Sequence, residues 1–147
     1  MSDIVTREVK IHASAATVFD YFVDPSKLAR WHAVAAEVDA RPGGTYRLEV
    51  IPGSIALGEF VELEPPNRLV YTWGWEGDQL VPPGSSTVEV TLEQDGEYTI
   101  VRIAHRGLPD EEQRDKHGMG WAHYLERLAV SAAGADPGPD PWHAGAP

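Results

Sequence analysis

The sequence predicts an α+β domain in which an antiparallel sheet packs against one long helix near the C-terminus. Apolar residues alternate in successive segments between residues 45 and 105, and only short turns separate these segments. Such turns can join antiparallel strands, whereas parallel strands need a crossover of a dozen or more residues. A long amphipathic helical pattern follows over residues 110–133. Two short helical segments directly after the first predicted strand complete the pattern.

The N-terminal part is predicted to contain one strand and two short helices. Residues 7–13 alternate in polarity, as expected of a strand with one buried face. Ser14 is a favourable N-cap for a helix over residues 14–23. Asp24 and Pro25 start a second short helix, because aspartate caps well and proline fits the first helical position. The two helices therefore separate the first strand from the rest of the sheet.

Five further strands are predicted, and each boundary carries a turn signal. Asp95-Gly96 has the sequence of a type I′ hairpin turn. A regular strand ending at Trp75 would place Tyr71, Trp73 and Trp75 on one face. The strands are expected at residues 45–51, 55–64, 68–75, 87–93 and 98–105.

The long helix is predicted to begin after Asp110, whose spacing to Gln113 matches a capping box, and to end before Gly134. At about 100° per residue, one side of this helix is apolar or aromatic and should be buried. That side comprises His117, Trp121, Tyr124, Leu125, Leu128 and Ala132. The solvent-facing side should comprise Lys116, Met119, His123, Glu126 and Arg127.

Two glycines lie on the shoulders of the buried side of this helix. Each lowers helix stability by about 1 kcal/mol relative to alanine, so their presence needs an explanation. Gly118 and Gly120 could allow close packing against a curved sheet, or they could leave room for the mouth of a cavity beside His117 and Trp121. The two interpretations are compatible.

The sequence divides into one domain, residues 1–133, and a tail, residues 134–147. The tail is rich in proline and glycine and has no apolar periodicity. A segment of this composition is expected to be disordered.

Composition and charge restrict the classes of function. The formal net charge is −11, so the surface should repel phosphate backbones and anionic lipids, and we expect neither nucleic acid nor a membrane as a partner. The chain has no cysteine, which excludes disulfides, thiolate metal sites and a cysteine nucleophile. No apolar run has the length of a membrane span, and the N-terminus has no signal-peptide core, so a cytoplasmic location is expected.

Five segments in order resemble one family. They are HASAATVFDYFVDPSKLARWH, RPGGTYRLEV, GEFVELEPPNRLVYTWGW, PGSSTVEVTLE and HRGLPDEEQRDKHGMGWAHYLERL. Over residues 4–130 the chain resembles the START-like or SRPBCC superfamily, and within it the heat-shock protein 90 ATPase activator homologue family. The resemblance implies the helix-grip fold, also called birch-pollen-allergen-like, in which a curved sheet encloses an apolar cavity against the C-terminal helix. Members include ligand binders, lipid carriers, polyketide cyclases and a co-chaperone domain, so the fold does not settle function.

The first functional hypothesis is that a small hydrophobic or aromatic ligand binds in a cavity between the sheet and the C-terminal helix. A mostly aromatic pocket with a few polar groups suits such a molecule. The candidate ligand-binding residues are Trp31, His32, Tyr71, Trp73, His105, His117, Trp121 and Tyr124.

Two alternatives remain open from the sequence. The family resemblance implies a co-chaperone-like interaction domain with a chaperone as partner. An enzyme of the polyketide cyclase or dehydratase type could use His105 and His117 as general acid and base, although the favoured interpretation is that each is a hydrogen-bonded core or rim histidine. No nucleophile motif or phosphate loop is present, which favours a binding protein, and neither a cofactor nor a metal is expected. A homodimer is compatible with a domain of this size, but no residue specifies one.

Overall fold

The computed structural model describes residues 3–144, with side chains through Trp142. Its elements, in chain order, are β1 (Val5–Ile11), α1 (Ala15–Val23), α2 (Pro25–Trp31), β2 (Ala35–Val38), β3 (Thr45–Ile51), β4 (Ser54–Glu64), β5 (Arg68–Trp73), β6 (Ser86–Asp95), β7 (Tyr98–Arg106), α3 (Glu111–Ala132) and α4 (Pro141–Ala144).

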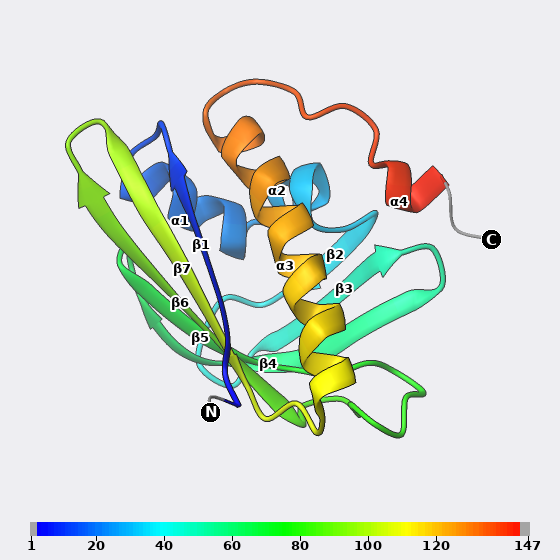
Figure 1. The fold of residues 1–147 in the computed structure, drawn as a ribbon. Coiled ribbons are helices and arrows are strands. Elements are labelled where there is room, and N and C mark those ends of the chain that lie inside the picture. Colours follow the sequence, from blue (N-terminus) through cyan, green and yellow to red (C-terminus); the bar gives the residue numbers. More distant parts are fainter. Residues whose placement is uncertain (1–2, 145–147) are drawn as a thin grey trace.

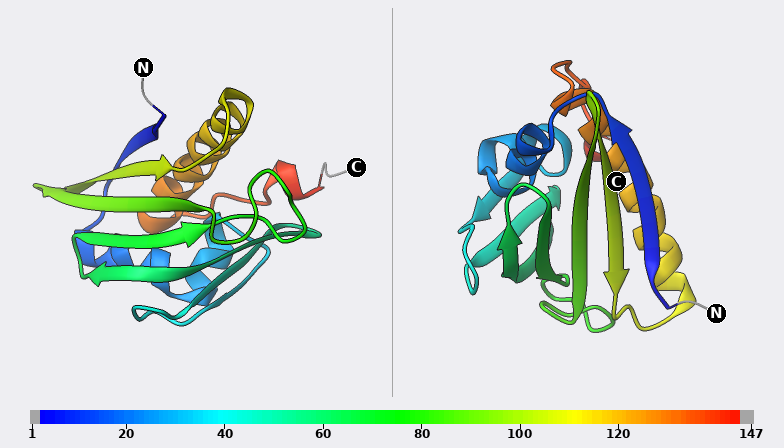
Figure 2. Two further views of the ribbon diagram at one scale, coloured as in Figure 1. Left: turned by 90° about the horizontal axis from the view of Figure 1, so that it is seen from below. Right: turned by 90° about the vertical axis from the view of Figure 1, so that its left-hand side faces the viewer.

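The seven strands form one antiparallel sheet in the order β1-β7-β6-β5-β4-β3-β2. The sheet curves around α3, and α1 and α2 lie at one end of it (Figures 1 and 2). This arrangement confirms the predicted helix-grip fold. The core lies between the concave face of the sheet and the helices, and the predicted buried side of α3 faces it.

The predicted helix starts are also confirmed. The Ser14 side chain accepts a hydrogen bond from the backbone N–H of Thr17. Asp24 caps α2, and the Asp110 side chain accepts from the backbone N–H of Gln113 at 2.8 Å. These side chains satisfy backbone donors that the first turn of each helix leaves without a partner.

β2 is a strand that the alternation pattern does not predict. It has four residues, two of them alanines, which have little preference for strands. Ala36 lies opposite Leu48 and Val38 opposite Tyr46, so the pairing with β3 holds this short segment in the sheet. Residues 35–38 were therefore not among the strands expected by residue range, because tertiary pairing rather than local pattern creates β2.

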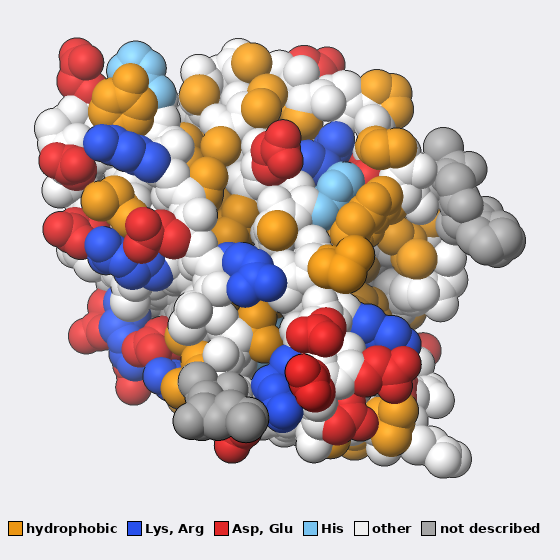
Figure 3. Space-filling model, viewed as in Figure 1, with side chains coloured by type: hydrophobic (Ala, Val, Ile, Leu, Met, Phe, Trp, Pro, Cys, Tyr) orange, Lys and Arg blue, Asp and Glu red, His pale blue; other side chains and the backbone are white. Residues whose placement is uncertain are grey.

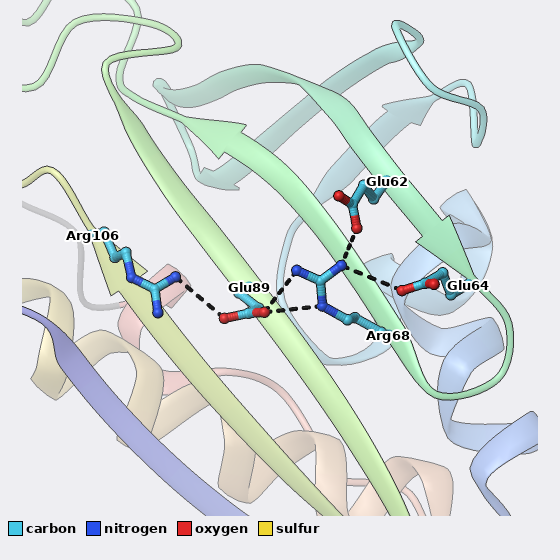
Figure 4. Close-up of polar contacts among 5 residues, drawn as sticks. All are labelled: Glu62, Glu64, Arg68, Glu89 and Arg106. Carbon is cyan, nitrogen blue, oxygen red and sulfur yellow. Dashed lines mark hydrogen bonds and ion pairs between the residues drawn. The ribbon is translucent and has the colours of Figure 1, made fainter.

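Charged side chains pair on the face of the sheet that points away from α3 (Figure 4). Arg68 on β5 binds Glu62 and Glu64 on β4 and Glu89 on β6, and Glu89 also binds Arg106 on β7 at 3.2 Å. The hydrogen bond from Arg68 holds the pKa of Glu89 below its ordinary value. These glutamates thus link neighbouring strands and stand apart from the interior of the domain.

The C-terminal segment differs from the expected disordered tail. After α3 the chain turns at Gly134, runs back beside α3 and ends in α4 (Figure 1). Asp140 is buried there, and its contacts leave His123 and Arg127 of α3 with only 20% and 13% of their side chains exposed. The prediction that these two side chains face solvent was wrong, because helical periodicity cannot reveal a later segment that covers them. Residues 145–147 lie outside the described part of the chain.

Among residues 3–144, no helix combines the length and apolarity that crossing a membrane requires.

Candidate functional site

A cavity of about 650 Å³ lies between α3, the β3–β4 hairpin and the loop that follows β5. Its aromatic and imidazole side chains come from the C-cap of α2, from β5 and the following loop, and from α3 and α4. They are His32, Trp73, Trp75, His117, Trp121, Tyr124 and Trp142. Val50, Ile51 and Ile55 of the hairpin contribute an aliphatic wall, and exposed polar side chains such as Lys116 and Glu76 lie where the cavity opens.

Five of the eight sequence-predicted residues line this cavity. They are His32, Trp73, His117, Trp121 and Tyr124. His32, which follows α2, stacks on Trp73 with ring centroids 5.6 Å apart and an angle of 4° between the planes. The same imidazole lies 5.3 Å from the Trp121 ring and 4.8 Å from the Tyr124 ring. Residues distant in sequence thus form one aromatic wall.

Trp31 and Tyr71 do not reach the cavity and belong to the packed core. The Trp31 indole lies behind His32, at 4.7 Å between ring centroids, and its N–H donates to the carbonyl oxygen of Tyr21 at 2.9 Å. Tyr71 is fully buried and stacks on Tyr46 at 4.1 Å. Both were expected in the site because they share a face or an element with residues that do line the cavity.

His105 also lies behind the cavity wall, and its two ring nitrogens are both engaged. Trp121 donates its indole N–H to Nδ1 at 3.0 Å, so the imidazole carries its proton on Nε2 and donates to Ser86 Oγ at 2.8 Å. Ser86 in turn donates to the carbonyl oxygen of Trp73 at 2.7 Å. Burial lowers the pKa of His105 to about 3, and repulsion from His117 contributes a smaller part. His105 therefore stays neutral and positions Trp121.

His117 lines the cavity and is neutral for a related reason. Its Nδ1–H donates to the carbonyl oxygen of Gln113 at 2.8 Å, and its Nε2 accepts from the Trp75 indole N–H at 3.0 Å. Burial lowers the pKa of His117, while Gln113 and Asp78 oppose this effect. A proton on Nε2 would face the indole donor. The hydrogen bond therefore holds the Trp75 indole in place and leaves no ring nitrogen of His117 free to act as a base.

Two polar groups of the aromatic wall have no hydrogen-bond partner among the described residues. They are the indole N–H of Trp73 and the hydroxyl of Tyr124, and both atoms are buried. A buried polar group left unpaired costs about 1–3 kcal/mol, so a water molecule or a ligand that paired with either group would be stabilised there. Burial also raises the pKa of the Tyr124 hydroxyl, which keeps it protonated and able to donate.

The two helix glycines have different surroundings. A Cβ atom on Gly118 would overlap the Arg7 guanidinium of β1 and lie 3.5 Å from Val5 Cγ1. A Cβ atom on Gly120 would have no described atom within 4 Å, and Gly120 lines the cavity. Gly118 thus permits close packing of β1 on α3, whereas Gly120 leaves open space.

Sequence reasoning missed the cavity residues of the hairpin, the loop and the C-terminal segment. Trp75 was treated as part of a regular strand, but β5 ends at Trp73, and the backbone N–H of Trp75 donates to the carbonyl oxygen of Val81. The glycine between the two tryptophans of the sequence WGW was the feature that could have indicated the end of the strand before Trp75. Nothing in the pattern of residues 134–147 indicated that Trp142 would contact the cavity.

The described residues hold no cluster of three or more histidine and carboxylate side chains that could bind a metal ion. His117 and His123 project from different sides of α3, where they contact Trp75 and Asp140 respectively.

Comparison with known proteins identifies the family. The family model "Activator of Hsp90 ATPase homolog 1-like protein" matches residues 12–133. The chain belongs to this family. The resemblance seen in the sequence is therefore confirmed over most of the domain.

Solved structures and one curated relative support the assignment. An AHSA1-like protein from Rhizobium etli is 48% identical, with a TM-score of 0.76, and the match covers 95% of this chain and 87% of that one. CalU16 from Micromonospora echinospora is 26% identical, with a TM-score of 0.75, over 96% of this chain and 79% of that one. An uncharacterised protein of Schizosaccharomyces pombe is 26% identical over 84% of this chain, which spans about a third (35%) of that relative.

Proposed function

We propose that this protein binds a small hydrophobic or aromatic molecule in the cavity between the sheet and α3. The observation that carries the proposal is the aromatic wall with two unpaired buried polar groups, on Trp73 and Tyr124. A volume of about 650 Å³ also falls in the range of small-molecule sites, roughly 300–1,000 Å³.

The unpaired groups define which ligand would fit. An indole N–H can only donate, so Trp73 requires an acceptor, and the protonated Tyr124 hydroxyl can also donate. A planar molecule with a carbonyl or phenolic oxygen would stack on the aromatic wall, and a rotation of Trp73 or Tyr124 would bring the buried donor to this oxygen. Such a ligand should bind more tightly than a hydrocarbon of the same shape.

The test is a titration with N-phenyl-1-naphthylamine, a neutral aromatic probe that fluoresces in apolar surroundings. The wild-type protein should enhance its fluorescence saturably. Gly120→Leu should lower the affinity at least tenfold by filling open space in the cavity, since no described atom occupies it. Ala122→Leu, on the exposed side of the same helix, is the matched control and should leave the affinity unchanged. Equal affinity in both variants would contradict binding in this cavity.

A co-chaperone-like function is the second candidate, and family membership is the observation that favours it. It predicts that the protein binds a heat-shock protein 90 chaperone and raises its ATPase rate. A pull-down and an ATPase assay with wild-type protein would test this, and no change in either would remove the candidate. A variant such as Gly120→Leu separates the two candidates, because it should weaken ligand binding without altering an interaction made by the outer surface.

The cyclase or dehydratase alternative has less support. General acid-base catalysis needs an imidazole nitrogen within reach of the substrate. Both nitrogens of His105 and of His117 are already hydrogen-bonded to protein groups.

A further inference from the structure

The segment after α3, residues 135–142, reaches the cavity. It passes around the C-terminal end of α3, turns back beside the helix and ends with Trp142 in α4 (Figure 1). Trp142 is one of the residues that line the cavity. Hydrophobic side chains gather on the surface between α3 and this segment, beside a histidine (Figure 3).

Asp140 fastens this segment to α3. Its side chain is buried, with 4% of the residue exposed. Its Oδ1 accepts from His123 Nε2 and from the backbone N–H of Trp142, each at 2.9 Å. The Arg127 guanidinium lies 3.9 Å from Oδ2 and donates to the carbonyl oxygen of Gly138 at 2.8 Å. A buried carboxylate with these partners holds the backbone before and after it in place.

Trp142 packs on two residues of α3. Its ring lies parallel to His123, with centroids 3.8 Å apart and 6° between the planes, and meets Tyr124 edge-on at 5.6 Å. Tyr124 belongs to the aromatic wall and carries one of the unpaired polar groups. The position of Trp142 is therefore linked through Tyr124 to the interior of the cavity, while 41% of Trp142 remains exposed to solvent.

We propose that residues 135–142 form a strap, that Trp142 is the outer wall of the ligand site, and that Asp140 is the positioning residue that holds the strap closed. The proposal rests on the ligand-binding function proposed above. A bound aromatic molecule would bury part of its surface against the Trp142 ring, and it could leave only past this ring or through the remaining opening. The strap should therefore set the affinity and, above all, the dissociation rate.

The experiment measures binding and dissociation of N-phenyl-1-naphthylamine with full-length variants by equilibrium and stopped-flow fluorescence. Trp142→Ala should weaken binding at least fivefold, mainly through faster dissociation. Asp140→Asn should show the same pattern to a smaller extent, because the asparagine keeps the shape but loses the charge that His123 and Arg127 face. Trp142→Phe should restore much of the affinity lost in Trp142→Ala.

Asp115→Asn is the matched control for Asp140→Asn. Asp115 is exposed on α3, and its replacement makes the same chemical change outside the strap. The probe should therefore dissociate from Asp115→Asn at the wild-type rate. Thermal unfolding of every variant establishes that each one is folded at the temperature of measurement.

The outcomes separate the two proposals. If the wild type and Gly120→Leu bind the probe equally, or neither binds it, the ligand site and the strap both fail. If Gly120→Leu loses affinity but Trp142→Ala keeps wild-type affinity and dissociation rate, the ligand site stands and the strap is overturned. If Trp142→Ala binds weakly while Asp140→Asn matches Asp115→Asn, Trp142 is a wall residue and the role of Asp140 is overturned.

Discussion

Of the buried histidines, His105 and His117 are held neutral by hydrogen-bond neighbours of opposite kind, a donor at one ring and an acceptor at the other. Trp121 presents an N–H to Nδ1 of His105, and the Gln113 carbonyl accepts from Nδ1 of His117. The first imidazole therefore carries its proton on Nε2 and the second on Nδ1. Protonating either ring would convert its acceptor nitrogen into an N–H that faces an indole N–H. The two hydrogen bonds from the indoles therefore depend on the neutral state of the imidazoles.

This dependence predicts a loss of stability in mild acid. The pKa of His105 is lowered to about 3 in the folded protein, against about 6.5 in an unfolded chain. The unfolded chain therefore binds a proton below pH 6.5 that the folded protein does not. The contribution of His105 is complete above pH 6.5 and is lost as the pH falls toward 3, by up to about 1.4 kcal/mol per pH unit.

The measurement is urea unfolding of wild type and His105→Asn at pH 7 and pH 5. Asparagine keeps an acceptor for the Trp121 indole but does not titrate in this range. Between these pH values the wild type should lose about 2 kcal/mol more than the variant. Glu89, whose pKa is also lowered, contributes equally to both proteins. Parallel losses would show that His105 takes up its proton without disrupting the fold.

The helix glycines predict a contrast between two alanine substitutions. Gly120→Ala should raise the free energy of unfolding by about 1 kcal/mol, because alanine favours the helix and the added Cβ meets no described atom. Gly118→Ala should gain less, since the Arg7 guanidinium must move before the Cβ fits. Chemical denaturation of both variants checks this. An equal or larger gain for Gly118→Ala would contradict the view that this glycine serves close packing.

At this scale, the sequence predicts which side chains point inward but not which atoms meet. Strand alternation places His105 inward, and helical periodicity does the same for His117 and Trp121. The pairing of His117 with Trp75 depends on the end of β5 and on a loop of several residues. Local periodicity carries no information about such a loop.

At the scale of elements, the sequence predicts those whose signal is local. Capping residues and turn pairs locate α1, α2, α3 and the β6–β7 hairpin. β2 contains no such signal, because it forms only by pairing with β3. The strap contains one, Asp140-Pro141, which resembles the pair that starts α2, but this signal marks a helix start and not the contact with α3 through Asp140. The low periodicity of residues 134–142 reflects an irregular path along α3.

The strap also predicts an effect on stability. A chain ending at Gly134 should unfold on the order of 5 °C below the full-length protein, since it loses charge-assisted hydrogen bonds together worth about 2 kcal/mol. Thermal unfolding followed by circular dichroism measures the difference. A chain ending at Ala144 keeps every strap contact described above and should match the full length. Equal melting temperatures for all three chains would mean that the strap is not docked in solution.

At the scale of the whole molecule, the cavity joins parts that are far apart in the sequence. The β3–β4 hairpin, the loop after β5, α3 and Trp142 all line it, yet each belongs to a different segment. The antiparallel sheet was predictable because its strands follow one another with short turns, and the helix-grip fold followed from the family resemblance. The shape of the cavity was not, because it depends on how these separate segments approach one another.

A ligand bound in this cavity should therefore protect several segments at once. With N-phenyl-1-naphthylamine at ten times its dissociation constant, the folded state gains about 1.4 kcal/mol, and amides that exchange by global unfolding should slow about tenfold. Amides of the β3–β4 hairpin, residues 76–79 and the first half of α3 should show additional local protection, because these segments line the cavity. Hydrogen–deuterium exchange with and without the probe measures this pattern. The β1 strand, which pairs with β7 away from the cavity, provides the internal reference for the global effect. Local protection confined to the outer face of the sheet would place the probe elsewhere, on a surface rather than between the sheet and α3.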